Sequence, residues 1–194
     1  MAEDRVKHTV VAIGGSAGSL EVILQLLAAL PSNKETIYIL ILHRKNDQTS
    51  TLSELLQSRS PRPVVEVEDK EPIRAGVIYL APPDYHLLIE NKNHFSLDSS
   101  EKVQYSRPSI DVTFESIAEV FGEQAIGILL SGANADGAQG MAVLKAAGAI
   151  TIAQDPASAD VSFMPQQAIN LNAHSHVLNT TGIIEYLQEV LSKD

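Results

Sequence analysis

Residues 9–24, TVVAIGGSAGSLEVIL, constrain the fold of this chain more than any other stretch. An apolar, β-branched run ends in glycines around a serine, and apolar residues then recur at helical spacing. This pattern predicts a strand, a tight corner at Ser16 and a helix. Gly14, Ser16 and Gly18 also fit the spacing G-x-S-x-G, in which a strained turn exposes a nucleophilic hydroxyl beside backbone N–H groups. The alternative is a glycine-rich turn ahead of a helix that binds phosphate, and the motif alone does not separate the two.

The phosphate-binding alternative fits the rest of the chain poorly. A dinucleotide-binding turn has the spacing G-x-G-x-x-G and an acidic residue at the end of the next strand. Here the glycines within 14–18 lack that spacing, the next strand ends at His43, and no Walker lysine follows the glycines. Nucleotide binding is therefore the less favoured interpretation.

Short apolar runs alternate with amphipathic segments over most of the chain. This order predicts a doubly wound α/β fold, with a mainly parallel sheet, helices on both faces and ligands at the carboxyl ends of the strands. Between residues 61 and 97, short strands separated by turn residues predict a β-rich insertion that ends in an antiparallel hairpin. The spacing of Thr51 and Glu54 predicts a capping box. The expected strands are 10–13, 36–42, 64–67, 77–80, 86–89, 94–97, 125–130, 150–153 and 177–178, and the expected helices are 20–27, 52–56, 110–121, 141–147 and 183–191.

Length and charge narrow the classes of function. With 194 residues, 44% of them hydrophobic, the chain is long enough for one well-buried domain, and we expect residues 1–194 to form a single domain. The formal net charge of −10 argues against nucleic-acid binding. The absence of cysteine excludes disulfides, thiolate metal sites and a cysteine nucleophile. Residues 1–8 are charged and resemble neither a signal peptide nor a membrane span, so we expect a cytoplasmic protein without direct membrane insertion.

Three expected strand ends carry side chains that can work together. The first strand ends at Ser16, the second at His43, and the run AIGILL continues through the glycine loop SGANADG to Asp136. A serine, a histidine base and a carboxylate that orients the base are the parts of a serine-hydrolase triad. The chain order Ser, His, Asp differs from that of α/β-hydrolases, so we expect a different fold. Each residue has a structural alternative: His43 as a hydrogen-bonded strand-end histidine, and Asp136 as a cap of the helix that follows it.

The other titratable candidates are less well placed. His8 precedes the first strand, at the opposite end of the sheet, while His86 and His94 lie in the expected insertion. Asp111 is expected to be a first-turn acid of a helix.

Several ordered motifs together resemble the catalytic domain of the CheB-type protein-glutamate methylesterases of bacterial chemotaxis. The similarity covers nearly the whole chain, and the motifs are GGSAGSLEVILQLLAALP, LHRKND, APPDYHLLIE, RPSIDVTFESIAEVFGEQAIGILLSGANADGAQG, AQDPASA and MPQQAI. The resemblance implies a seven-stranded, mainly parallel sheet with helices on both sides and an antiparallel hairpin.

The resemblance also implies a site and a reaction. The family's triad matches Ser16, His43 and Asp136, and its oxyanion donors correspond to the backbone N–H groups of Ala17 and Ala133. The implied reaction is hydrolysis of γ-glutamyl methyl esters on the cytoplasmic helices of a methylated chemoreceptor or receptor-like protein, with release of methanol and a second activity as a glutamine deamidase. It needs neither a metal nor an organic cofactor. The alternatives are a serine esterase or amidase for another substrate, and a receptor-binding signalling module with little turnover.

The chain departs from the family's pattern around the mouth of the expected site. Leu42, Arg44 and Lys45 stand where the family commonly has glutamine, methionine and proline; residues 131–134 read SGAN against T-G-M-G, and Phe163 replaces a glycine. Full-length members carry a receiver domain ahead of the catalytic domain, whereas this sequence begins at the catalytic strand, which predicts activity without a phosphodonor. The cationic pair Arg44 and Lys45 is expected either to steer the domain toward glutamate-rich receptor helices or to be a solvated loop.

Overall fold

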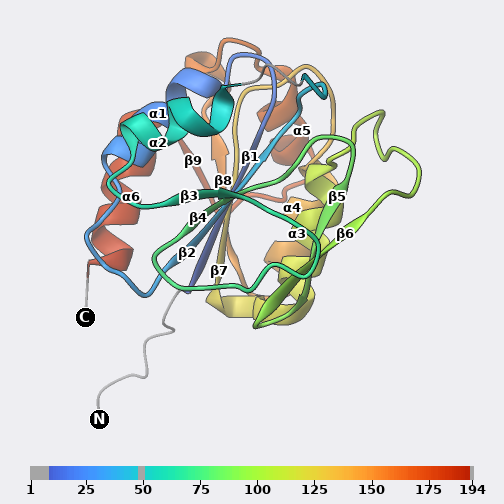
Figure 1. Ribbon diagram of the computed structural model, residues 1–194. Helices are drawn as coiled ribbons and strands as arrows, with labels where there is room; N and C mark the ends of the chain where they lie inside the picture. Colours follow the sequence, from blue (N-terminus) through green and yellow to red (C-terminus); the bar gives the residue numbers. More distant parts are fainter. Residues whose placement is uncertain (1–8, 48–50, 193–194) are drawn as a thin grey trace.

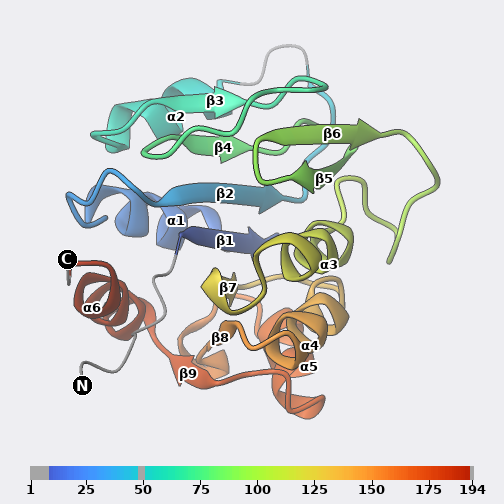
Figure 2. The same ribbon diagram turned by 90° about the horizontal axis from the view of Figure 1, so that it is seen from below.

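The computed structural model, described over residues 9–47 and 51–192, contains a seven-stranded sheet in the order β3-β4-β2-β1-β7-β8-β9. All neighbouring strands of this sheet run parallel (Figure 2). A separate antiparallel hairpin joins β5 to β6. The strands are β1 (Val10–Gly15), β2 (Ile37–Leu42), β3 (Val64–Glu66), β4 (Ile78–Leu80), β5 (His86–Asn91), β6 (His94–Asp98), β7 (Ala125–Leu129), β8 (Ile150–Gln154) and β9 (His176–Leu178).

Helices cover both faces of the sheet, as Figure 1 shows. Because side chains alternate along a strand, Val10 and Ala12 of β1 belong to one hydrophobic cluster while Val11 and Ile13 belong to the other. Burial on both faces explains why the strands are continuously apolar. One face is covered by α1 (Leu20–Ala28), α2 (Leu52–Arg59) and α6 (Thr180–Leu191), and the other by α3 (Ile110–Phe121), α4 (Ala138–Ala146), α5 (Phe163–Asn170) and the hairpin. Two short 3-10 turns lie at Gly122–Gln124 and Pro156–Ser158.

The doubly wound fold is confirmed, but the expected β-rich insertion is only half right. Strands β3 and β4 extend the main sheet beyond β2, and only β5 and β6 form the separate hairpin. The physical reason is burial: all three residues of β4 are buried, as in a central parallel strand. The hairpin packs on α3, where the Ser116 hydroxyl accepts a hydrogen bond from the Ile89 N–H at 3.0 Å and the Thr113 hydroxyl donates to the Leu87 carbonyl at 2.7 Å.

Two local expectations need correction. Thr51 is the N-cap of α2, but its side chain makes no capping hydrogen bond, so the expected capping box is wrong. The helix instead buries Leu56 against the sheet. Helix α5 was not among the expected helices, because its eight residues carry too few apolar positions for a clear helical period. Residues 1–8, including His8, lie outside the described part of the chain. None of the described helices is long and apolar enough to cross a membrane.

Candidate active site

The ends of three adjacent strands carry the candidate site. Strand β1 lies between β2 and β7, and backbone hydrogen bonds continue this arrangement beyond the strands. The His43 N–H donates to the Gly15 carbonyl at 3.1 Å, and the Ser16 N–H donates to the Ser131 carbonyl at 2.9 Å. Ser16 is therefore held between the segment that carries His43 and the loop that leads to Asp136.

The corner at Ser16 is tight but is not a strained nucleophile elbow. The Ser19 hydroxyl closes the turn by donating to the Ser16 carbonyl at 2.7 Å. A Cβ on Gly15 would lie 2.6 Å from the Ser19 side chain, and Gly18 has φ +78°, so both positions need glycine. Among the described residues, the non-glycine positions with positive φ do not include Ser16, which corrects the expectation of strain there. Ser16 is half-buried, and its hydroxyl makes no hydrogen bond to the described residues.

His43 and Asp136 form a short hydrogen bond. The Nε2 atom of His43 lies 2.6 Å from Oδ2 of Asp136. The histidine side chain is 12% exposed and the aspartate is fully buried, so the pair reaches solvent only through the ring. Because Nε2 faces the carboxylate, it carries the proton in the neutral ring, and Nδ1 is the nitrogen left to accept one.

Asp136 also anchors the start of helix α3. Its Oδ1 accepts hydrogen bonds from the Ser109 hydroxyl at 2.8 Å and the Asp111 N–H at 3.0 Å, and its Oδ2 accepts one from the Ile110 N–H at 2.7 Å. These N–H groups belong to the first turn of α3, where backbone donors lack partners within the helix and the helix dipole favours negative charge. The carboxylate that faces His43 is therefore fixed on both oxygens.

A second carboxylate completes a crossed pair. Asp111, in the first turn of α3 as expected, accepts hydrogen bonds from the Gly137 N–H at 2.9 Å and the Gly140 N–H at 2.7 Å, at the start of α4. The structural alternative for Asp136, a cap of the helix that follows it, is therefore excluded, because Asp111 takes that role and Asp136 caps α3. Asp136 stabilises the start of α3, which carries Asp111, and Asp111 stabilises the start of α4, which follows Asp136. These crossed contacts hold the glycine loop against α3.

Burial raises the pKa of Asp111 to about 6; the two glycine N–H bonds oppose the shift, and the neighbouring charge of Asp136 adds to it. The unfolded chain releases this proton near pH 3.8 and the folded protein near pH 6, so the folded state binds more protons in between. The contribution of Asp111 to the free energy of unfolding therefore falls as the pH rises through this window.

We expect Asp111→Asn to remove this pH dependence while keeping an oxygen that accepts from Gly137 and Gly140. The free energy of unfolding of the variant minus that of the wild type should rise as the pH is raised from 4 to 7, by on the order of 1–3 kcal/mol. Urea unfolding at several pH values measures the difference. Glu119→Gln, on the exposed side of the same helix, is the control and should show no such trend. A constant difference between Asp111→Asn and wild type across the range would contradict the prediction.

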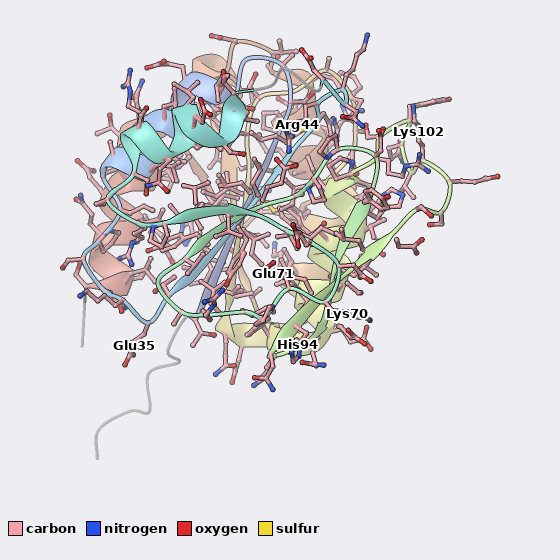
Figure 3. All side chains as sticks on the ribbon, viewed as in Figure 1. Glu35, Arg44, Lys70, Glu71, His94 and Lys102 are labelled. Atoms are coloured by element: carbon pink, nitrogen blue, oxygen red, sulfur yellow. The ribbon has the colours of Figure 1, made fainter. Side chains whose placement is uncertain are left out.

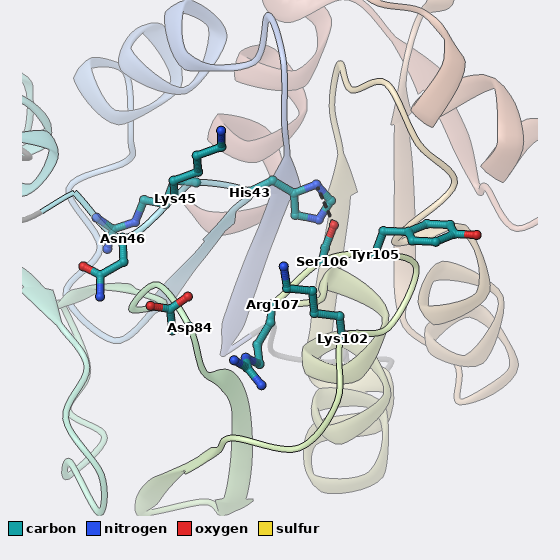
Figure 4. Close-up of a pocket in the computed structure, with 9 residues that line it drawn as sticks. His43, Lys45, Asn46, Asp84, Lys102, Tyr105, Ser106 and Arg107 are labelled. Carbon is teal, nitrogen blue, oxygen red and sulfur yellow. Dashed lines mark hydrogen bonds between the residues drawn. The ribbon is translucent and has the colours of Figure 1, made fainter.

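The other ring nitrogen of His43 faces a serine that the sequence analysis did not single out. Nδ1 lies 3.4 Å from the hydroxyl of Ser106, a contact drawn as a dashed line in Figure 4. The Asn134 side chain holds this serine by donating to its hydroxyl and to the Gln104 carbonyl, both at 3.2 Å. Asn134 is one of the departures from the family pattern, and here it ties the glycine loop to the 104–106 segment. For Ser16 to transfer its proton to Nδ1, the Ser16 hydroxyl must take the place of the Ser106 hydroxyl beside that nitrogen.

The expected oxyanion donors lie at exposed positions on two touching loops. Ala17 and Ala133 are both exposed, and neither N–H donates a backbone hydrogen bond within the described residues. Ser131 joins the loops, because its hydroxyl donates to the Ala17 carbonyl at 2.7 Å and its N–H donates to Oε1 of buried Gln154 at 2.9 Å. Both N–H groups therefore have no partner among the described residues, which leaves them able to donate to an oxyanion.

Three polar residues of this site were not predicted from the sequence as functional positions: Ser106, Ser109 and Gln154. The signal for Ser109 was its place just ahead of an apolar helical period, where serine is a favoured N-cap; it does cap α3. The others act through contacts between distant segments, which local spacing does not report. The described residues contain no cluster of three or more histidines, cysteines or carboxylates that could hold a metal ion.

Comparisons with known proteins find similarity over most of the chain. The family model described as CheB methylesterase matches residues 11–187. A relative from Leptospira interrogans, provisionally named a protein-glutamate methylesterase/protein-glutamine glutaminase, is 37% identical over 93% of both chains. A Symbiobacterium thermophilum protein of that name, without the qualifier, is 33% identical over 98% of this chain but 52% of its own length. The chain thus spans about half of this and several other relatives.

A solved structure gives the same result for the fold. The crystal structure of the Thermotoga maritima CheB methylesterase catalytic domain superposes with a TM-score of 0.89 at 32% identity, covering 95% of this chain and all of that one. The family model and the relatives each cover well over half of the chain, so the resemblance inferred from the motifs is confirmed. The chain belongs to the CheB methylesterase family.

Proposed function

We propose that this protein hydrolyses γ-methyl esters of glutamyl residues in a receptor or receptor-like protein, with Ser16 as nucleophile, His43 as base and Asp136 as the residue that orients the base. The observation that carries the proposal is the 2.6 Å contact between His43 and buried Asp136 at the strand ends that flank Ser16. The names of the relatives, protein-glutamate methylesterase/protein-glutamine glutaminase, support the substrate class.

The first half of the reaction forms an acyl-enzyme. Nδ1 of His43 takes the proton of the Ser16 hydroxyl as the oxygen attacks the γ-carbonyl carbon of the ester. The N–H groups of Ala17 and Ala133 stabilise the oxyanion of the tetrahedral intermediate. Nδ1 then returns the proton to the leaving methoxide, methanol departs, and an ester joins Ser16 to the glutamyl group.

The second half releases the product. Nδ1 takes a proton from water as the oxygen of that water attacks the acyl carbon. Collapse of the second intermediate passes the proton from Nδ1 to the Ser16 oxygen, which restores the hydroxyl, and frees a glutamic acid that ionises to the carboxylate in solvent. Asp136 holds the ring in one tautomer and stabilises the imidazolium in both halves. A glutamine side chain follows the same path with ammonia as the leaving group, so one site supports the deamidase activity as well.

The direct test is methanol release from membranes that carry methylated receptors. The purified protein should release methanol in proportion to the methyl groups lost from the receptor, and Ser16→Ala protein in the same membranes should release none above background. Binding to the receptor without methanol release or loss of methyl groups would favour a signalling module over an enzyme. If the protein hydrolysed small esters but removed no methyl groups from the receptors, an esterase for another substrate would be favoured.

A further inference from the structure

A cationic cavity of about 460 Å³ opens beside His43, on the side away from Asp136. Four of its lining residues are basic and one is acidic, in a chain whose net charge is −10. Figure 4 shows that the basic side chains come from two segments, the one that follows β2 and the one that follows β6. The charged lining residues are Arg44, Lys45, Lys102, Arg107 and Asp84.

Both arginines of this cavity already have hydrogen-bond partners within the protein. Arg44 bonds to Oε2 of Glu66 at 2.7 Å and donates to the Ala81 carbonyl, so its charge is neutralised. Arg107 donates to the Ser99 and Ser100 carbonyls, both at 2.8 Å. The expectation that Arg44 acts as a free docking charge is therefore not supported.

The two lysines are available. Within the described part of the chain, the ammonium groups of Lys45 and Lys102 make no hydrogen bond or ion pair, and both side chains are exposed. In Figure 4 the Lys102 side chain reaches from its own segment into the space between His43, Asp84 and Arg107. Both lysines line this cavity, so together they make its electrostatic potential more positive, which attracts an anion.

We propose that Lys45 and Lys102 form a subsite for a side-chain carboxylate that neighbours the reacting ester in an acidic peptide segment. This inference rests on the proposed esterase function. The reacting methyl ester is neutral, so a substrate anion that these cations bind must be a group other than the ester. A segment that carries several glutamyl residues supplies carboxylates within reach of a cavity of this size. The subsite thus favours esters that have side-chain carboxylates close by in the same peptide.

The test compares two synthetic peptides with one central γ-methyl glutamate, flanked by glutamates in one and by glutamines in the other. The readout is the ratio of kcat/KM for the glutamate-flanked peptide to that for the glutamine-flanked peptide. We expect Lys45→Glu combined with Lys102→Glu to lower this ratio by about tenfold or more at low ionic strength. In wild type the ratio should fall toward one as salt rises, because salt screens exposed charges.

A matched control reverses two lysines outside the cavity. Lys70, which pairs with Glu90, and Lys92, which bonds to Gln124, are both exposed. In Figure 3, Lys70 lies well away from Arg44 and Lys102. Lys70→Glu combined with Lys92→Glu changes the net charge equally and should leave the ratio at the wild-type value. An unchanged ratio in the cavity variant, or an equal fall in both variants, overturns the subsite.

A binding measurement separates failure of the subsite from failure of the proposed reaction. If wild type hydrolyses neither peptide, the esterase proposal fails, and titration calorimetry of the unesterified glutamate-flanked peptide still tests the cavity. Ser16→Ala protein should then bind that peptide more tightly than the glutamine-flanked one, and the cavity variant should lose the preference. Equal affinity for both peptides in Ser16→Ala protein contradicts the proposal whether or not the enzyme turns over.

Discussion

Replacing Ser16 with alanine should lower kcat for ester hydrolysis by on the order of 10⁵-fold and leave the fold intact. The loss is large because alanine has no oxygen to form the acyl-enzyme, and the remaining oxyanion donors supply only a small part of the rate. The fold should survive because the hydroxyl of Ser16 makes no hydrogen bond to the described residues, whereas the backbone contacts of the corner persist. Methanol release and thermal unfolding measure the two effects.

Ser106→Ala is the matched control, because Ser106 is the serine whose hydroxyl lies 3.4 Å from Nδ1 of His43. We expect this variant to change kcat by less than about tenfold, since a hydrogen bond of that length contributes little. If Ser106→Ala abolished hydrolysis and Ser16→Ala did not, the nucleophile would be Ser106.

Combining Ser16→Ala with His43→Ala should lower kcat scarcely more than either change alone, because triad members act as a unit.

The second large effect is expected for Asp136→Asn, which should lower kcat by about 10³- to 10⁴-fold and also destabilise the protein by roughly 1–3 kcal/mol. Activity falls because an amide nitrogen toward Nε2 of His43 favours the wrong tautomer. Stability falls because the four donors around the carboxylate leave no acceptor for an amide NH₂, so at least one buried N–H loses its partner. Single-turnover kinetics and urea unfolding on the same protein measure both losses.

Ser109→Ala separates the two roles of Asp136. It removes one donor to Oδ1 but leaves the contact between Oδ2 and His43. We expect it to lose stability with a far smaller loss of kcat than Asp136→Asn shows. If Asp136→Asn lost stability alone and kept its kcat, Asp136 would be only a helix cap and the triad assignment would be wrong.

The sequence by itself determined the framework of this protein. Apolar runs that alternate with amphipathic segments require parallel strands between helices, and parallel strands place their carboxyl ends at one edge of the sheet. Ser16, His43 and the loop of Asp136 could therefore be brought together from local pattern alone. The ordered motifs then identified the family, because several independent matches in one order are far more specific than one glycine-rich corner.

Only the tertiary structure decided how these groups are held. That β3 and β4 extend the sheet, that Asp136 caps α3 while Asp111 caps α4, and which nitrogen of His43 faces the acid all depend on how distant segments dock. The same is true of the cavity beside His43, which Lys45 and Lys102 both line. Periodicity and capping preferences describe neighbours a few residues apart, whereas a buried carboxylate takes whichever donors the packed helices leave without partners.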